Sequence, residues 1–453
     1  MRMALIQCPP WDINAPPLGI AYLDSYLSSR GYKVFSYDIN IELYNLSKNK
    51  RLWEVGHKYS NFWKNNEKVR KFLDGYLKNF VEKITQKVPQ LVGFSVANTN
   101  LASSLIIAEK LKQKDKNIKI VFGGPECSLK RSWKFIIEKK YIDAVVFGEG
   151  ELVFYNLLKG LENKGKFIKT KGAILKEEAG TNNHKKEKLI EDIDSLSFPN
   201  FDSFDLSKYK IKNSLPIVNS RGCINNCIYC SERKFWEFYR FRKAEEVFRE
   251  IKRDIEKYHT KTFFFNDSII NGNLKELEKL CDLIIKEKIK INWNGNAMIR
   301  KDMNYKLLKK MHKAGCTHLI YGVENASDHV LKLMKRNYDS KLAQKVLRET
   351  YKAGIQPVAN WIIGFPGEIK NDFISNLVFL IRNRRFFKVS PVSTFKVLND
   401  TDIMEKLNDY NIILDDSNFA DGWKTKDNKN TPVIRERRLK IFNIFLTLLK
   451  MRQ

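Results

Sequence analysis

Three cysteines lie within eight residues, in the segment Cys223-Ile-Asn-Asn-Cys227-Ile-Tyr-Cys230. At this spacing each thiolate can bind a different iron of a [4Fe–4S] cube, which leaves the fourth iron open to a small molecule. A structural zinc site is the alternative, but zinc usually takes paired cysteines and a fourth ligand close by. The next histidine is His259 and the next cysteine is Cys281. We therefore expect an iron–sulfur cluster with one open coordination site.

Alternating apolar runs and amphipathic stretches follow from residue 217 and must position these cysteines. We expect strands at residues 217–220, 262–265, 290–294, 318–322, 357–364 and 388–394, with helices between them such as 243–258 and 274–286. Six β/α units predict a partial TIM-type barrel over residues 213–400, in which working residues sit at the carboxyl ends of the strands. The cysteine motif follows the first expected strand, where this rule places a reactive site.

Residues 1–155 also alternate between strands and helices. We expect strands at residues 3–7, 33–38, 91–96, 118–122 and 144–147, and helices at 18–29 and 100–113. The pattern predicts a Rossmann-like, doubly wound α/β domain, whose ligands bind beyond the carboxyl ends of the strands. Turn or small polar residues occupy those ends and suggest a groove for a large, flat or phosphate-bearing ligand. They are Pro10, Ser95, Thr99, Gly123, Gly124 and Gly148.

Composition limits the remaining possibilities. The 453 residues are 43% hydrophobic, which is enough for two or three cored domains. We interpret residues 156–212 as a linker and residues 401–453 as a partly helical C-terminal extension. Seven cysteines, three of them in one motif, favour a reducing, cytoplasmic setting, and we expect neither a secretory signal nor a transmembrane segment. The net charge of +29 comes mostly from scattered lysines, so a nucleic-acid partner is not expected.

The segment Ser220-Arg-Gly-Cys223-x3-Cys227-x2-Cys230 resembles the cluster loop of radical S-adenosylmethionine (SAM) enzymes. Similar motifs lie at the next four expected strands. They are Phe265-Asn-Asp267, Trp293-Asn-Gly-Asn296 with Arg300, Ala314-Gly-Cys-x4-Tyr-Gly-Val-Glu324-Asn-Ala-Ser, and Trp361-Ile-Ile-Gly364-Phe-Pro-Gly-Glu368. The combination is far more specific than any one of its parts.

Residues 1–155 resemble the cobalamin-binding domain that precedes the barrel in one large subgroup of that family. The matching segments are Pro9-Pro10, Pro17-Leu-Gly-Ile-Ala-Tyr-Leu, Gly93-Phe-Ser-Val, Gly123-Gly-Pro-Glu126 and Gly148-Glu-Gly-Glu151. Two departures stand out. The family's Asp-x-His-x-x-Gly motif is missing and the only histidine here is His57, so no histidine lower ligand to cobalt is expected. Glu126 stands where the subgroup often has histidine.

The resemblance implies the cofactors and the chemistry. Cys223, Cys227 and Cys230 would hold the [4Fe–4S] cluster, and an external donor such as flavodoxin or ferredoxin would reduce it. SAM would then be cleaved to a 5′-deoxyadenosyl radical, and a methyl group would pass through methylcobalamin to an unactivated carbon of a small-molecule or natural-product substrate. The residues expected to contact SAM are Tyr229, Asn296, Arg300, Glu324, Ile362 and Gly364. Those expected to contact cobalamin are Pro10, Ser95, Thr99, Gly123, Gly124, Glu126 and Gly148.

Two alternatives remain open at this point. The same scaffold could catalyse a radical cyclisation or rearrangement without methyl transfer, and no sequence feature separates the two outcomes. A radical SAM protein that modifies or binds RNA would use the positive charge. Only Cys8 and Cys127 precede the motif, which is too few for the second three-cysteine cluster of the methylthiotransferases that act on tRNA. The substrate and the oligomeric state are not specified by the sequence.

Overall fold

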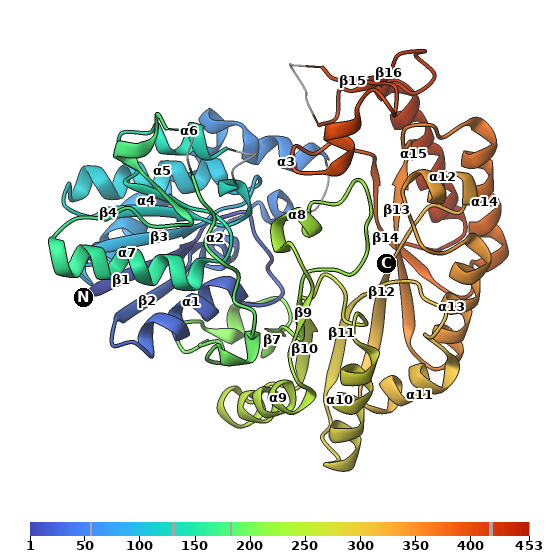
Figure 1. The fold of residues 1–453 in the computed structure, drawn as a ribbon, viewed down its shortest axis with the longest axis horizontal. Coiled ribbons are helices and arrows are strands. Elements are labelled where there is room, and N and C mark those ends of the chain that lie inside the picture. The colour runs from blue at the N-terminus through green and yellow to red at the C-terminus, as the bar shows by residue number, and fades with distance from the viewer. Residues whose placement is uncertain (55–56, 129–131, 182–183, 416–419, 453) are drawn as a thin grey trace. The chain divides into compact units, whose positions relative to one another are not determined.

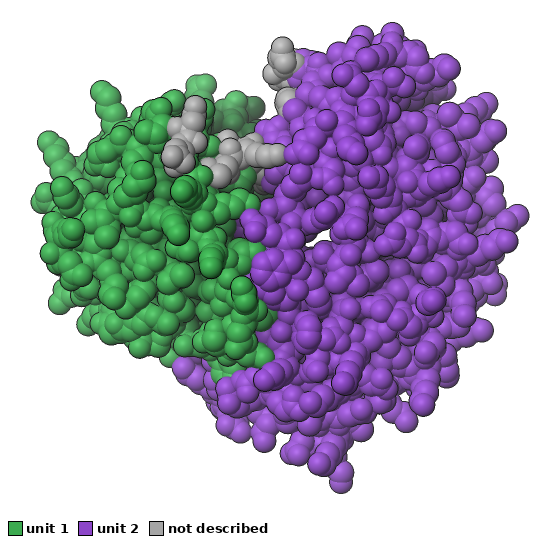
Figure 2. All heavy atoms as spheres, viewed as in Figure 1, with its two compact units in different colours: residues 1–216 green, residues 217–453 purple. Residues whose placement is uncertain are grey.

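The computed structural model describes residues 1–54, 57–128, 132–181, 184–415 and 420–452. The chain divides into two compact units, residues 1–216 and 217–453, which are coloured separately in Figure 2. Among the helices of the described residues, none combines the length and the hydrophobicity needed to cross a bilayer.

A six-stranded sheet forms the centre of the first unit, in the order β2-β1-β3-β4-β5-β6 (Figure 1). Its strands are β1 (Arg2–Gln7), β2 (Lys33–Asp38), β3 (Leu91–Ser95), β4 (Lys119–Gly123), β5 (Ala144–Val146) and β6 (Ala173–Leu175). The pairs from β2 to β5 are parallel, and β6 is antiparallel to β5. The strand order reverses between β1 and β3, and ligands of such sheets bind beyond the strand ends at this switch point. The predicted doubly wound fold is therefore confirmed.

Helices of the first unit supply much of its core. They are α1 (Leu18–Ser28), α2 (Ile39–Leu46), α3 (His57–Lys64), α4 (Asn66–Thr85), α5 (Leu101–Lys114), α6 (Trp133–Ile137) and α7 (Gly150–Lys164). Helix α4 begins where the Asn65 side chain accepts a hydrogen bond from the Lys68 amide. Its buried residues Val69, Leu73 and Leu77 repeat every four positions and therefore share one face. This face packs into the core that also contains α5 and the central strands.

Residues 156–212 contain more regular structure than a linker. The stretch includes the end of α7 and the whole of β6, which hydrogen-bonds along β5. Strand β6 has only three residues, all of them buried, and lies within a lysine-rich sequence. So short an apolar run did not indicate a strand in the sequence. It covers a sheet edge that would otherwise expose unpaired backbone groups.

The second unit contains the predicted partial barrel, with strand order β14-β13-β12-β11-β10-β7. The strands are β7 (Ser214–Ile217), β10 (Thr262–Phe265), β11 (Asn292–Ala297), β12 (Cys316–Glu324), β13 (Gln356–Ile363) and β14 (Lys388–Thr394). The division between the two units falls within β7. Neighbouring strands from β10 to β14 are parallel. Two short pairs lie outside this sheet, β8 (Ser220–Arg221) with β9 (Arg240–Phe241), and β15 (Ile412–Ile413) with β16 (Lys424–Thr425).

The first barrel strand was predicted at residues 217–220, and this prediction was wrong by three residues. Strand β7 ends at Ile217 because the following backbone turns toward Asp267. The Asp267 carboxylate accepts hydrogen bonds from the Asn219 amide at 3.0 Å and from the Ser220 hydroxyl at 2.5 Å. These bonds take the chain out of the strand ladder before the cysteine segment begins.

Helices cover the outer face of this sheet (Figure 1). They include α9 (Ala244–Tyr258), α10 (Leu274–Lys286), α11 (Tyr305–Lys313), α13 (Ser340–Lys352), α14 (Lys370–Asn383) and α15 (Pro432–Leu448). Trp361 of β13 packs against Phe379 of α14 and Phe442 of α15, so its side chain lies on the outer face. Because strand side chains alternate, the neighbouring Ile362 lies on the inner face of the barrel.

Candidate active site

The cysteine segment forms a loop between β8 and α8 (Glu232–Trp236) at the carboxyl end of the barrel. Gly222 precedes it with φ +89°, and a Cβ atom there would lie 2.6 Å from the Phe238 carbonyl oxygen. Only glycine therefore lets the loop pass this backbone. None of the three cysteines is in a disulfide; Cys227 is buried, and the other two are partly exposed.

The environment of the three thiols fits a cluster. Burial raises the pKa of Cys223 and raises the pKa of Cys230 to about 12, so iron must displace their protons on binding. The charge of Cys227 raises the pKa of both thiols further, so the three sulfurs lie close enough to interact electrostatically. No group of three acidic, histidine or cysteine side chains among the described residues could hold a single metal ion. A cube needs no such convergence, because each thiolate binds its own iron.

Arg336, which the sequence did not single out, lies beside these thiols. It follows α12 (Asp328–Leu333), and its Nη1 donates to the Cys227 Sγ at 2.9 Å while its Nη2 donates to the Gly322 carbonyl oxygen at 2.5 Å. Burial lowers the pKa of Arg336, but neighbouring acidic groups, led by Tyr338 and Tyr229, raise it by more. A permanent positive charge therefore faces the cysteine loop.

Glu324 and Tyr229, both predicted to contact SAM, meet at the same place. Glu324 ends β12 with φ +63°, in a backbone conformation uncommon for glutamate. Burial raises the pKa of its carboxyl group, and Arg336 and the Tyr229 hydroxyl partly offset this effect. The Tyr229 ring packs edge-on against Phe365 and Phe395, which fixes its position in the loop. The structure thus brings a partly buried carboxyl group, a phenol and a guanidinium together next to a cysteine sulfur.

The other predicted SAM contacts lie along the same strand ends. Asn296 of β11 donates through Nδ2 to the Asp267 carbonyl oxygen at 3.1 Å. Ile362 packs against an apolar cluster of the barrel, and Gly364 follows β13 with φ +76°. Arg300 forms two hydrogen bonds to the Asp302 carboxylate, at 2.5 and 2.7 Å, so its role in SAM binding stays a prediction.

A buried amide marks the entrance to the cysteine loop. Asn219 is fully buried, and neither polar atom of its side chain has a hydrogen-bond partner within the described structure. Buried polar groups nearly always have a partner, so the donor and the acceptor of this amide are available to a water or a ligand group. Its backbone is held by Asp267, whose own pKa burial raises to about 7.

In the first unit, two of the predicted cobalamin contacts line one cavity. The Thr99 hydroxyl donates to the Pro10 carbonyl oxygen at 3.5 Å, where the chain leaves β1 and β3. Both residues border a cavity of about 720 Å³ at this edge of the sheet. Its other lining residues are Trp11, Asp12, Ile13, Asn14, Tyr44, Lys50, Arg51, Leu52, Trp53, Glu54, Trp63 and Lys210. Its aromatic walls and its place at the switch point fit a large planar ligand.

The remaining predicted contacts follow β3, β4 and β5. The Ser95 carbonyl oxygen accepts a hydrogen bond from the Asn100 side chain at 3.2 Å. Gly124 has φ +105°, and a Cβ there would lie 2.6 Å from the Val96 carbonyl oxygen, so the backbone itself requires this glycine. Gly123 and Gly148 have no such close neighbour. Glu126 is buried and accepts a hydrogen bond from the Ser132 hydroxyl. Contact of these residues with cobalamin stays a prediction.

Comparison with known proteins agrees with this geometry. The radical SAM superfamily model matches residues 217–380, and the B12 binding domain model matches residues 13–158. An uncharacterized methyltransferase, PH0819 of Pyrococcus horikoshii, is 28% identical over 68% of this chain and 69% of its own length. The anaerobic magnesium-protoporphyrin IX monomethyl ester cyclase of Rubrivivax gelatinosus is 25% identical over 78% of this chain and 60% of its own length.

A solved structure shares the fold across nearly the whole chain. The cobalamin-dependent SAM radical enzyme OxsB, with aqua-cobalamin and SAM bound, has a TM-score of 0.72 and 16% identity, covering 95% of this chain and 64% of OxsB. The two domain matches identify a [4Fe–4S] cluster, SAM and cobalamin as the cofactors. The chain is therefore a radical SAM enzyme that carries an N-terminal B12-binding domain.

Proposed function

We propose that this enzyme transfers a methyl group from SAM, by way of cobalamin, to an unactivated carbon of a small molecule. The observation that carries the proposal is that three cysteines outside any disulfide lie in one loop at the end of the barrel beside Arg336 and Glu324, in a chain that also has a B12-binding domain. When bound, the cluster supplies the electron that cleaves SAM. The relative from Pyrococcus horikoshii is a methyltransferase by name, which supports methyl transfer as the reaction.

The residues of the second unit have separate tasks in this proposal. Cys223, Cys227 and Cys230 hold the cluster, and the cation of Arg336 stabilises negative charge on the sulfurs. Glu324 at the end of β12 accepts hydrogen bonds from the polar part of SAM. Tyr229, Asn296, Arg300, Ile362 and Gly364 complete the proposed SAM site, and an external flavodoxin or ferredoxin supplies the electron.

A second candidate function is radical ring closure without methyl transfer. The relative from Rubrivivax gelatinosus is a cyclase by name, and it matches a larger share of this chain than the methyltransferase does. Both reactions would use the same cysteines and the same cofactors. The fate of the SAM methyl group is therefore the property that separates them.

Labelled SAM tests the proposal. The protein, purified without oxygen and reduced, is incubated with SAM that carries a trideuterated methyl group and with candidate substrates, and the products are analysed by mass spectrometry. Methyl transfer predicts 5′-deoxyadenosine together with a product that carries the label. Formation of 5′-deoxyadenosine with a converted but unlabelled product would favour ring closure. The C227A variant, which lacks one cluster ligand, controls for background cleavage of SAM.

A further inference from the structure

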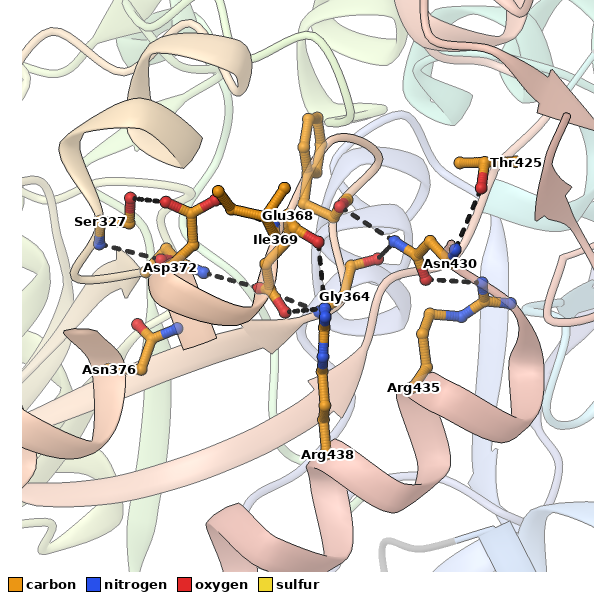
Figure 3. A network of polar contacts seen from close by, with 12 residues as sticks. Ser327, Gly364, Glu368, Ile369, Asp372, Asn376, Thr425, Asn430, Arg435 and Arg438 are labelled. Carbon is orange, nitrogen blue, oxygen red and sulfur yellow. Dashed lines mark hydrogen bonds and ion pairs between the residues drawn. The ribbon is translucent and has the colours of Figure 1, made fainter. Parts of the chain in front are cut away.

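The C-terminal helix α15 contacts the end of β13, where Ile362 and Gly364 are proposed to contact SAM. This helix and the segment before it lie beyond residues 217–380, the range that the radical SAM model matches. Figure 3 shows polar contacts that connect α15 and its preceding segment to the turn after β13. Two arginines on one face of α15, Arg435 and Arg438, make the principal contacts from the helix.

Arg438 pairs with the buried carboxylate of Glu368. Its Nη1 donates to Glu368 Oε1 at 2.8 Å and to the Glu368 carbonyl oxygen at 3.1 Å. The Glu368 side chain has no exposed surface, and that of Arg438 is 13% exposed. Burial raises the pKa of Glu368 to about 7, and the positive charge of Arg438 opposes this rise and so favours the ionised carboxylate.

Glu368 in turn connects two strand ends. Its Oε2 accepts hydrogen bonds from the Gly364 amide after β13 and from the Asn325 side chain after β12, both at 3.2 Å. Asn325 directly follows Glu324, so one carboxylate holds together the ends of two strands that carry proposed SAM contacts. An ionised Glu368 accepts both bonds, whereas a protonated one has fewer acceptor sites.

The carbonyl oxygen of Gly364 is held by the segment that precedes α15. Asn430 donates through Nδ2 to the Gly364 and Phe365 carbonyl oxygens, each at 3.1 Å. Arg435 donates to Asn430 Oδ1 at 3.3 Å and lies 3.7 Å from the centre of the Trp423 ring. A Cβ on Gly364 would lie 2.4 Å from Arg435 Cγ, so the glycine and the helix are packed without space between them.

We propose that Arg438 is a positioning residue for SAM: through Glu368 it holds the Gly364 turn in the shape that receives SAM. The inference rests on the proposed function, because it assumes that SAM binds at the end of β13. It assigns the C-terminal segment a part in cofactor binding. The Arg438–Glu368 ion pair has no net charge and is largely buried, and its carboxylate accepts a hydrogen bond from the Gly364 backbone amide. These properties suit a contact that aligns the end of a strand.

The test is the R438M variant, with R437M as the matched control, because Arg437 is the exposed neighbour on the same helix. Binding of SAM to the cluster-loaded proteins is measured anaerobically by titration calorimetry. Loss of the charge-assisted contact with Glu368 predicts a dissociation constant raised on the order of tenfold, with an unchanged number of sites. Hydrogen exchange at the Gly364 amide should be faster in R438M without SAM, and R438K should restore part of the affinity.

The outcomes separate positioning from general stability. A reduced number of sites with an unchanged dissociation constant would overturn the inference, because Arg438 would then act on folding alone. SAM affinity equal to that of the unsubstituted protein would also overturn it. Absence of SAM binding by the unsubstituted protein would overturn the proposed function together with this inference, whereas unchanged binding by R438M would overturn the inference only.

Discussion

Replacing Arg336 by methionine should make the cluster harder to reduce. The guanidinium donates to the Cys227 sulfur at 2.9 Å and keeps its positive charge, so it stabilises the more negative, reduced state. A hydrogen bond from a charged group contributes about 1.5–3 kcal/mol. Because about 1.4 kcal/mol corresponds to about 59 mV for one electron, the R336M variant should have a reduction potential lower by about 60–130 mV.

Redox titration followed by electron paramagnetic resonance measures this shift, after iron analysis has shown that the variant retains its cluster. The Y338F variant is the matched control. Tyr338 donates to the Gly322 carbonyl oxygen at 2.8 Å, as Arg336 does at 2.5 Å, but carries no charge toward the sulfur. Its potential should stay within about 20 mV of the unsubstituted protein. Equal potentials for R336M and the unsubstituted protein would refute the electrostatic role of Arg336.

Two further predictions concern the first unit. The G124A variant should lose about 2 kcal/mol or more of unfolding free energy in urea, because alanine tolerates neither φ +105° nor a Cβ 2.6 Å from the Val96 carbonyl oxygen. G123A, whose Cβ would meet only Val146 at 3.7 Å, should lose much less, and equal losses would contradict the argument. Burial raises the pKa of Asp38 from 3.8 to about 7, so its contribution to stability is present below pH 4 and is lost as the pH rises through 7. Melting temperatures should therefore fall less between pH 4 and pH 7 in D38N than in the unsubstituted protein, and an identical pH dependence would show that Asp38 does not titrate in this range.

The cysteine loop and the strand positions could be predicted because neighbouring residues in the sequence determine them. Cys223, Cys227 and Cys230 are close in sequence, and their spacing alone indicates the geometry of their sulfurs. Strand β3 is a short, mostly apolar run, and β13 is a mostly apolar run that Gly364 follows directly, so their positions were predicted to within a few residues. The carboxyl ends of parallel strands meet at one edge, which brought Glu324 and the cysteine loop together in the prediction.

Contacts between distant segments could not be predicted in this way. Arg336 is 109 residues from Cys227, and Arg438 is 70 residues from Glu368. The chain has 81 lysines and arginines, and the residues next to a given arginine in the sequence do not indicate which distant side chain it contacts. The end of β7 depends on hydrogen bonds that the Asp267 carboxylate accepts, and because Asp267 is 48 residues from Asn219 the end of this strand was predicted wrongly for the same reason.

The cofactor content of the purified protein shows whether the three cysteines hold an iron–sulfur cluster and the chain binds cobalamin. The protein and a variant with Cys223, Cys227 and Cys230 replaced by alanine are produced anaerobically with iron, sulfide and cobalamin supplied, and metals and corrinoid are quantified after gel filtration. We expect about four irons and about one cobalamin per chain, with iron lost and cobalamin retained in the variant. Bound zinc with neither iron nor cobalamin, or iron content that survives removal of the three cysteines, would contradict this expectation.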